Sequence, residues 1–217
     1  NKKEIKFKKL WRTVFIFTIA LPQFVSLLAV RKILAVSGPI NSMLVDLGFL
    51  DKGMEFLDLA KNPNTARITV LIINLWVGIP YTMLTMTGIL QNIPADLYEA
   101  ARVDGANAFV TFFKITLPYM LFVTMPSLIT TFTGNINNFN VIYLLSNGNP
   151  IKGVAGGASV GHTDLLITWL FKMTFGSTES KYYMASIVGI LIFVVVAVLS
   201  LIIYNVIPST KNEEDYK

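Results

Sequence analysis

The hydrophobic pattern of this chain is dominated by long stretches that contain no Asp, Glu, Lys or Arg. These stretches are Thr13–Val30, Ile68–Ala95, Ile115–Ile151 and Tyr182–Thr210. A helix needs about 20 residues to cross the hydrocarbon layer of a membrane, so the last three are long enough and the first is marginal. Because backbone groups in lipid must bond one another, the spans should be helices. We predict an all-α, polytopic membrane helix bundle that forms a single domain. The expected spans lie at about 11–31, 67–91, 115–137 and 182–207.

Composition supports a membrane protein and excludes several kinds of chemistry. Hydrophobic residues make up 53% of the chain and charged residues only 14%, against about 25% charged in soluble domains. With no cysteine, the sequence excludes disulfides, thiolate metal sites and thiol nucleophiles. The single histidine, His162, has only Asp164 near it and cannot build a metal site. No Gly-rich phosphate loop of the Walker type is present, so we expect no cofactor and no ATP hydrolysis on this chain.

The basic residues near the N-terminus set the expected orientation. Six of the first twelve residues are Lys or Arg, and such a cluster beside a span marks the cytoplasmic side rather than a nucleic-acid site. Four spans then place both ends of this segment in the cytoplasm. The first residue is Asn, and four spans are few, so we expect a longer polypeptide with at least one further span upstream.

The two segments expected outside carry turn signals. Gly38-Pro39, Asn62-Pro63 and the run Asn147-Gly148-Asn149-Pro150 favour irregular loops over helices. The apolar stretch Thr163–Phe175 is too short to span, and we expect it to lie at the outer interface or to pack over the bundle.

The loop between the second and third spans, residues 92–114, predicts a helix–turn–helix on the cytoplasmic face. Asn92 or Asp96 can cap the first helix, Pro94 suits its first turn, and Gly105 can end it before a second short helix. Small residues would let the surface of another protein approach the backbone, namely Ala100, Ala101 and Ala106. Charged residues could bond to that partner, namely Glu99, Arg102 and Asp104.

These residues resemble the EAA signature of ATP-binding-cassette (ABC) importer permeases. The resemblance rests on Glu99-Ala100-Ala101, Asp104-Gly105-Ala106, and Phe113, Ile115, Leu117 and Pro118. Over essentially the whole chain, the sequence is similar to the larger membrane subunit of maltose and maltodextrin permeases. Val123 departs from the pattern, because family members often have proline there. The departure affects the expected bend of the third span and leaves the expected docking unchanged.

The resemblance implies a coupling role and a set of partners. The coupling loop of the family docks in a groove of a cytoplasmic ATPase. By resemblance the coupling residues are Glu99, Ala100, Ala101, Asp104, Gly105 and Ala106. The implied partners are a second permease subunit, two copies of an ATPase that carries the ATP and Mg, and an external sugar-binding protein. The implied location is the bacterial cytoplasmic membrane.

Two polar sets inside the spans are candidates for a sugar path. Asn74, Gly78 and Tyr81 are spaced i, i+4 and i+7 and therefore share one helical face. The Asn74 amide and the Tyr81 ring suit the hydroxyl groups and the C–H surface of a carbohydrate, and Gly78 leaves room for it. Asn135 and Asn138 are expected on one face of the third span, in its outer half, and the resemblance assigns all five residues to substrate binding. Another interpretation is that Asn74 bonds a neighbouring helix and Gly78 marks helix packing. The first span has Gln23 and Leu27 where the family has sugar contacts, so none is assigned there.

We therefore predict the transmembrane subunit of an ABC importer that moves maltose, maltodextrin or a related oligosaccharide by alternating access, and that is not itself an enzyme. The same machinery could carry another solute, such as a raffinose-type sugar or glycerol phosphate. An ion-driven transporter would normally hold an ionisable group at mid-membrane, which all four spans lack. A purely structural subunit would need neither polar set.

Overall fold

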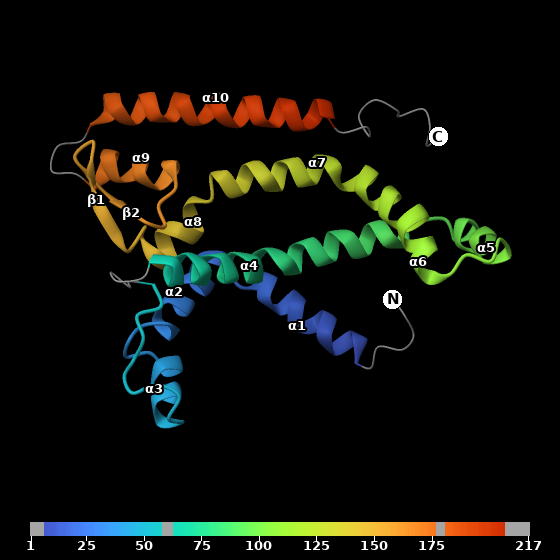
Figure 1. Ribbon diagram of the computed structural model, residues 1–217, viewed down its shortest axis with the longest axis horizontal. Helices are drawn as coiled ribbons and strands as arrows, with labels where there is room; N and C mark the ends of the chain where they lie inside the picture. Colours follow the sequence, from blue (N-terminus) through green and yellow to red (C-terminus); the bar gives the residue numbers. More distant parts are fainter. Residues whose placement is uncertain (1–6, 58–62, 177–180, 207–217) are drawn as a thin grey trace. The chain divides into compact units, whose positions relative to one another are not determined.

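The computed structural model describes residues 7–57, 63–176 and 181–206. The chain divides into two compact units. The first consists of Asn1–Pro80 and Ile136–Val194, and the second of Tyr81–Asn135 and Val195–Lys217. Figure 1 labels the helices and strands, and each unit is described by itself.

Among the described residues, three helical segments are long and apolar enough to cross a membrane. They are α4 (Pro63–Gln91), the run Ala108–Ser146, and Tyr182–Asn205 within α10 (Tyr182–Val206). The run Ala108–Ser146 consists of α6 (Ala108–Thr111), the π-helical turn η1 (Phe112–Thr116), α7 (Leu117–Ile136), α8 (Phe139–Val141) and the π-helical turn η2 (Ile142–Ser146). These three segments overlap the residues predicted as the second, third and fourth spans, and the run Ala108–Ser146 extends beyond the predicted 115–137 at both ends.

The long helices bury few of their apolar side chains within this chain. Leu71 and Leu75 on α4, and Ile187 and Phe193 on α10, are among many exposed bulky residues. Soluble proteins rarely expose apolar surface on this scale, so lipid or other membrane helices must cover it. The chain is therefore a multi-pass membrane segment with a mainly helical fold, as predicted.

The segment predicted as the first span is divided between two shorter helices. These are α1 (Lys8–Ala20) and α2 (Gln23–Ile33), and neither alone has the length of a span. The break falls at Leu21-Pro22, where Leu21 is extended (φ −80°, ψ 133°). Proline disfavours helical backbone in the residue before it and has no N–H to continue a helix, which explains the interruption.

The prediction that the two outer segments, around 31–67 and 138–181, favour irregular loops over helices is only partly right. The run Asn147-Gly148-Asn149-Pro150 does form a turn, with Asn147 and Gly148 at positive φ, whereas Asn62 lies outside the described residues. Regular elements occupy other parts of both segments. The first contains α3 (Pro39–Asp46), whose Gly38-Pro39 dipeptide starts a helix rather than a turn. The second contains an antiparallel hairpin of β1 (Ile151–Ala155) and β2 (Ala158–Gly161), followed by α9 (Leu166–Phe175). Figure 1 shows the hairpin beside α9, which contacts β2.

A small apolar core joins four elements of the first unit. It consists of Leu27 on α2, Val70 on α4, and Val141, Ile142 and Leu145 from α8 and η2. Leu27 and Leu145 are completely buried. Apolar packing therefore brings α4, which carries Asn74, against α8 and η2, which directly follow Asn138.

Candidate functional site

The structure contains the predicted helix–turn–helix in the second unit, formed by α5 (Ala95–Val103) and α6. Gly105 ends α5 in the left-handed conformation, with φ +72°. Its N–H donates to the Arg102 carbonyl at 3.1 Å, and the Ala106 N–H donates to the Ala101 carbonyl at 2.8 Å. These two bonds form a Schellman motif, which satisfies the last carbonyls of the helix and turns the chain sharply toward α6.

The helix starts differ in part from the prediction. Pro94 is the N-cap of α5, and no side chain caps that helix, so the predicted capping by Asn92 or Asp96 is wrong. Asp96 instead lies inside the first turn, where its negative charge interacts favourably with the positive end of the helix dipole. The second helix, α6, is capped by Asn107, whose Oδ1 accepts from the Val110 N–H at 2.9 Å.

The first helix is tied to the start of the third span. The Tyr98 hydroxyl and the Thr116 Oγ1 lie 3.2 Å apart, and Thr116 is buried. Ile93, just before α5, is also buried. The Tyr98–Thr116 contact therefore links a displacement of α5 directly to the helical run that begins at α6.

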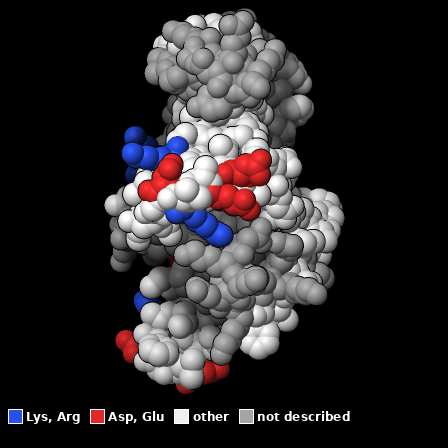
Figure 2. Space-filling model, turned by 90° about the vertical axis from the view of Figure 1, so that its right-hand side faces the viewer, with Lys and Arg blue, Asp and Glu red and all other residues white. Residues whose placement is uncertain are grey.

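The predicted coupling residues fall into exposed and buried groups. Glu99, Ala100, Asp104 and Gly105 are exposed, Ala106 is half-buried, and Ala101 is buried. Figure 2 looks onto the side of the structure where α5 and α6 lie, and it shows acidic and basic side chains gathered there. Ala101 is thus a packing position within the loop, whereas the other small residues remain accessible to a partner.

Large apolar side chains accompany the charges. Val103 is 87% exposed and Phe109 77% exposed, and Phe113 is also exposed. Phe112 and Phe113 meet edge to face with ring centroids 5.2 Å apart. Exposed apolar residues mixed with charges on a compact element are typical of a protein–protein interface.

In the first unit, the structure brings two of the predicted substrate-binding residues together. The Asn138 Nδ2 donates to the Asn74 Oδ1 at 2.8 Å, and both residues are half-buried. Asn138 also caps α8, because its Oδ1 accepts from the Val141 N–H at 3.4 Å. The interpretation that Asn74 bonds a neighbouring helical element is therefore confirmed, and the pair exposes only part of its amide groups.

The prediction that Asn135 and Asn138 share one helical face is wrong. The helix α7 ends at Ile136, and Asn138 has the non-helical ψ of 73° that its capping role requires. Asn135 remains on α7, is exposed, and donates to the Thr131 carbonyl at 2.8 Å. A capping amide competes with helix continuation, which explains the break.

Gly78 and Tyr81 keep the predicted spacing from Asn74 along the continuous helix α4. No side chain or other backbone lies within 4 Å of the point where a Gly78 Cβ would sit. Tyr81 is 68% exposed. Tyr81 and Asn135 belong to the second unit and the other three residues to the first. Substrate binding by these five residues stays a prediction.

A second polar cluster was missed by the sequence reasoning. Arg67, at the start of α4, donates from Nε to the His162 carbonyl at 3.0 Å, and its Nη2 lies 3.4 Å from the His162 Nδ1. Close by, Asp164 and Lys172 form an ion pair of 2.8 Å with side chains 3% and 11% exposed. The sequence offers little signal for the contact between Arg67 and His162, because the two residues lie 95 positions apart. Within the described ranges, no group of three His, Cys, Asp or Glu side chains could hold a metal ion.

The sequence belongs to a defined family of transport proteins. Residues 1–211 match the model of the family described as binding-protein-dependent transport system inner membrane component. The chain is therefore a member of the binding-protein-dependent transport system inner membrane component family.

Several relatives are sugar permeases. The chain is 36% identical over 220 residues to the maltodextrin transport system permease protein MdxF of Bacillus subtilis, covering 99% of this chain and 49% of that protein. It is 38% identical over 214 residues to the galactooligosaccharides transport system permease protein GanP of the same species, covering 98% and 49%. It is 40% identical over 200 residues to the maltose/maltodextrin transport system permease protein MalF of Salmonella typhimurium, covering 91% and 38%. The chain thus spans at most about half the length of these relatives.

Proposed function

We propose that this chain forms the translocating part of a membrane subunit in an ATP-driven importer of maltodextrin or a related oligosaccharide. The observation that carries the proposal is the family match over residues 1–211, which includes the helix–turn–helix and the polar pair. The named relatives are permeases for maltose, maltodextrin and galactooligosaccharides. The importer would lie in a bacterial cytoplasmic membrane, with the N-terminus and the C-terminus of this segment in the cytoplasm.

The helix–turn–helix would receive a cytoplasmic ATPase. Exposed Glu99 and Asp104 offer acceptors for charge-assisted bonds, while exposed Val103 and Phe109 supply apolar contact area. The Tyr98–Thr116 contact would pass a movement of the ATPase to the third span. ATP and Mg would be bound by two copies of that partner, and this chain would act as a transport subunit and not as an enzyme.

The polar side chains of α4 and of Asn138, the N-cap of α8, would line part of the sugar path. The Asn74–Asn138 pair supplies amide groups, Gly78 leaves open space, and Tyr81 offers an exposed aromatic ring. Sugars need hydrogen-bond partners for their hydroxyl groups and a flat apolar face for their C–H surface. Asn135 would contribute a further amide. A second permease subunit would complete the path, and an external binding protein would deliver the sugar.

A galactooligosaccharide is the second candidate for the cargo. The specific observation in its favour is GanP, which is 38% identical over 98% of this chain. Both cargoes are chains of hexoses with the same kinds of polar groups. The amides and the tyrosine described here suit either, so the choice between them is experimental.

Ion-driven transport is disfavoured by the long helices. No Asp, Glu, Lys or Arg stands at residues 68–91, 115–136 or 182–206. Proton or sodium coupling normally requires an ionisable group near mid-membrane. The energy for transport would therefore come from the partner ATPase.

The proposal is tested with the full-length importer reconstituted in vesicles with its ATPase and binding protein. We expect ATP-dependent uptake of maltotriose or a galactooligosaccharide, and Tyr81→Ala should reduce uptake about tenfold, the loss expected when a sugar-stacking ring worth 1–2 kcal/mol is removed. Tyr183→Ala is the matched control, because Tyr183 on α10 is equally exposed at 68% and has no role in the proposed path. Uptake without ATP, or equal activity of the two variants, would contradict the proposal.

A further inference from the structure

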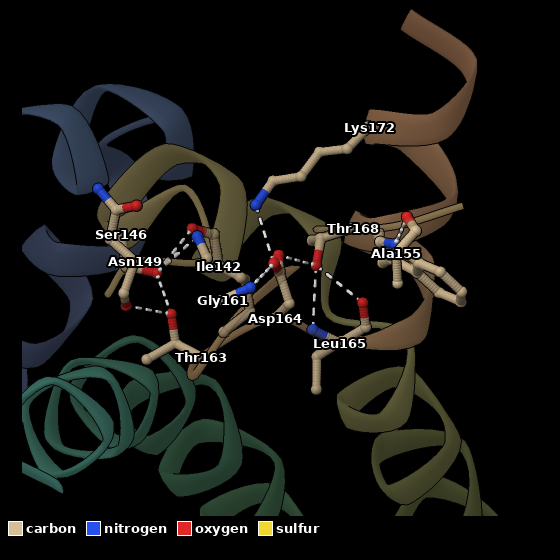
Figure 3. A network of polar contacts seen from close by, with 12 residues as sticks. Ile142, Ser146, Asn149, Ala155, Gly161, Thr163, Asp164, Leu165, Thr168 and Lys172 are labelled. Atoms are coloured by element: carbon tan, nitrogen blue, oxygen red, sulfur yellow. Dashed lines mark hydrogen bonds and ion pairs between the residues drawn. The ribbon is translucent and has the colours of Figure 1, made fainter. Parts of the chain in front are cut away.

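The polar cluster around Asp164 holds a compact element together. Residues 147–175, which contain β1, β2 and α9, are called the hairpin module here. The Asp164 Oδ2 accepts from the Lys172 Nζ at 2.8 Å and from the Gly161 N–H at 2.7 Å, while Oδ1 accepts from the Thr168 Oγ1 at 2.9 Å. Figure 3 shows these donors converging on the carboxylate. Three charge-assisted bonds on a buried carboxylate make the module internally rigid.

The hairpin module is fastened to η2. The Ser146 Oγ lies 2.9 Å from the Thr163 Oγ1 and accepts from the Gly148 N–H at 3.2 Å. The Thr163 Oγ1 donates to the Asn149 carbonyl at 2.7 Å. Ser146 and Thr163 are both buried, so water competes little for these bonds. The module therefore moves with η2 and with Asn138, which caps the helical turns just before it.

The same module is fastened to α4 by one arginine. Arg67 makes the two contacts to His162 given above, and its Nη1 lies 3.5 Å from the Asn64 Oδ1 within α4. Arg67 precedes Asn74 by seven residues, which is two helical turns on the same face. The guanidinium is planar and fixes direction as well as distance.

These contacts close a ring. Starting from α4, Arg67 bonds His162 of the module, Thr163 of the module bonds Ser146 of η2, and Asn138 bonds back to Asn74 of α4. The apolar core between α4 and η2 is non-directional and tolerates rotation of one helix against the other. The directional hydrogen bonds at two levels of α4 oppose such a rotation, the Asn74–Asn138 bond in a partly buried position and the Arg67 contacts in an exposed one.

We propose that Arg67 is a positioning residue: it pins the start of α4 to the hairpin module and thereby fixes the placement of Asn74 opposite Asn138. The inference rests on the proposed function where it concerns sugar, and on geometry alone where it concerns the two helical elements. Arg67 itself touches no part of the proposed path. Replacing Arg67 should therefore raise the half-saturating sugar concentration more than it changes the maximal transport rate.

The first readout is the distance between the two elements in the full-length importer complex without nucleotide. Nitroxide labels are placed at Leu71→Cys on α4 and Asn140→Cys on α8, both exposed positions in a segment that has no native cysteine. We expect one narrow distance distribution by pulsed electron paramagnetic resonance with Arg67 present, and a clearly broadened one in Arg67→Gln. Lys152→Gln is the matched control, since Lys152 is an exposed basic residue on β1 of the same module. An unchanged distribution in Arg67→Gln would overturn the proposal.

The second readout is sugar dependence in the same variants without labels. Arg67→Gln should raise the half-saturating sugar concentration about two- to tenfold, the range of one net hydrogen bond, while the maximal rate changes little. His162→Ala keeps the backbone acceptor of the 3.0 Å bond and should have a smaller effect than Arg67→Gln. A broadened distance with unchanged sugar dependence supports the positioning role and counts against Asn74 and Asn138 as sugar ligands. A change in sugar dependence without a change in distance would overturn the positioning role.

Discussion

Replacing Gly105 by alanine should strain the turn of the helix–turn–helix without creating a clash. Gly105 has φ +72°, and no neighbouring atom lies within 4 Å of the position that a Cβ would take. The penalty is therefore conformational alone, about 1–2 kcal/mol for an L-residue in the left-handed region. Because the Schellman bonds of Gly105 and Ala106 require this backbone, the strain must be overcome for α5 and α6 to keep their relative direction.

The strain should appear as weaker docking of the ATPase. A change of about 1–2 kcal/mol corresponds to about a 5- to 30-fold loss of affinity if the partner must restore the turn. The assay is titration of the purified ATPase against the full-length permease complex in nanodiscs. Gly105→Asn should lose less than Gly105→Ala, because asparagine tolerates the left-handed region better.

A matched glycine separates this effect from a general one. Gly88 lies inside α4, is not at positive φ, and also has open space at its Cβ position. Gly88→Ala should leave docking unchanged, because alanine is a better helix former than glycine. If Gly105→Ala docked as well as the original chain, or if asparagine and alanine were equivalent there, the assignment of the turn as the element that shapes the interface would be refuted.

Two further predictions concern the hairpin module. Asp164→Asn should lower the free energy of unfolding of the module by about 3–5 kcal/mol, because Lys172 would remain buried without a counter-charge. The measurement is amide hydrogen exchange of α9, which should become faster. No change in exchange would contradict the buried ion pair. Gly161→Ala should also destabilise, by about 1–3 kcal/mol, because its Cβ would overlap the Gly148 carbonyl oxygen, whereas Gly153→Ala meets nothing and is the control. Equal melting temperatures for these two alanine variants would show that the close approach is absent.

The sequence was sufficient to predict the features that depend on uniform local composition. The charge-free runs around α4, α7 and α10 were long enough that helices were the only plausible spanning elements. Gly105 between two short helical patterns was a sufficient signal for the turn. The resemblance to importer permeases agreed with the family match over residues 1–211.

The errors arose where one residue or a tertiary contact decides the structure. Pro22 divides an apolar run that composition alone reads as one helix, and Asn138 ends a helix by capping the next. The hairpin had a usable signal in Gly156-Gly157, two glycines at positive φ between short strands, which the loop prediction from Asn147-Gly148-Asn149-Pro150 did not use. The Arg67–His162 contact joins residues 95 positions apart and leaves little trace in the sequence.

The most direct measurement is cross-linking from the helix–turn–helix in the intact importer. A cysteine is introduced at Ala100, which is exposed on α5, and a matched one at Met43, which is exposed on α3. Both are treated with a short thiol-directed cross-linker while the complex imports sugar. We expect Ala100→Cys to capture the ATPase, with a yield that changes on adding ATP, and Met43→Cys to capture none of it. Capture of the ATPase from Met43→Cys but not from Ala100→Cys would contradict the central claim that this loop receives the ATPase.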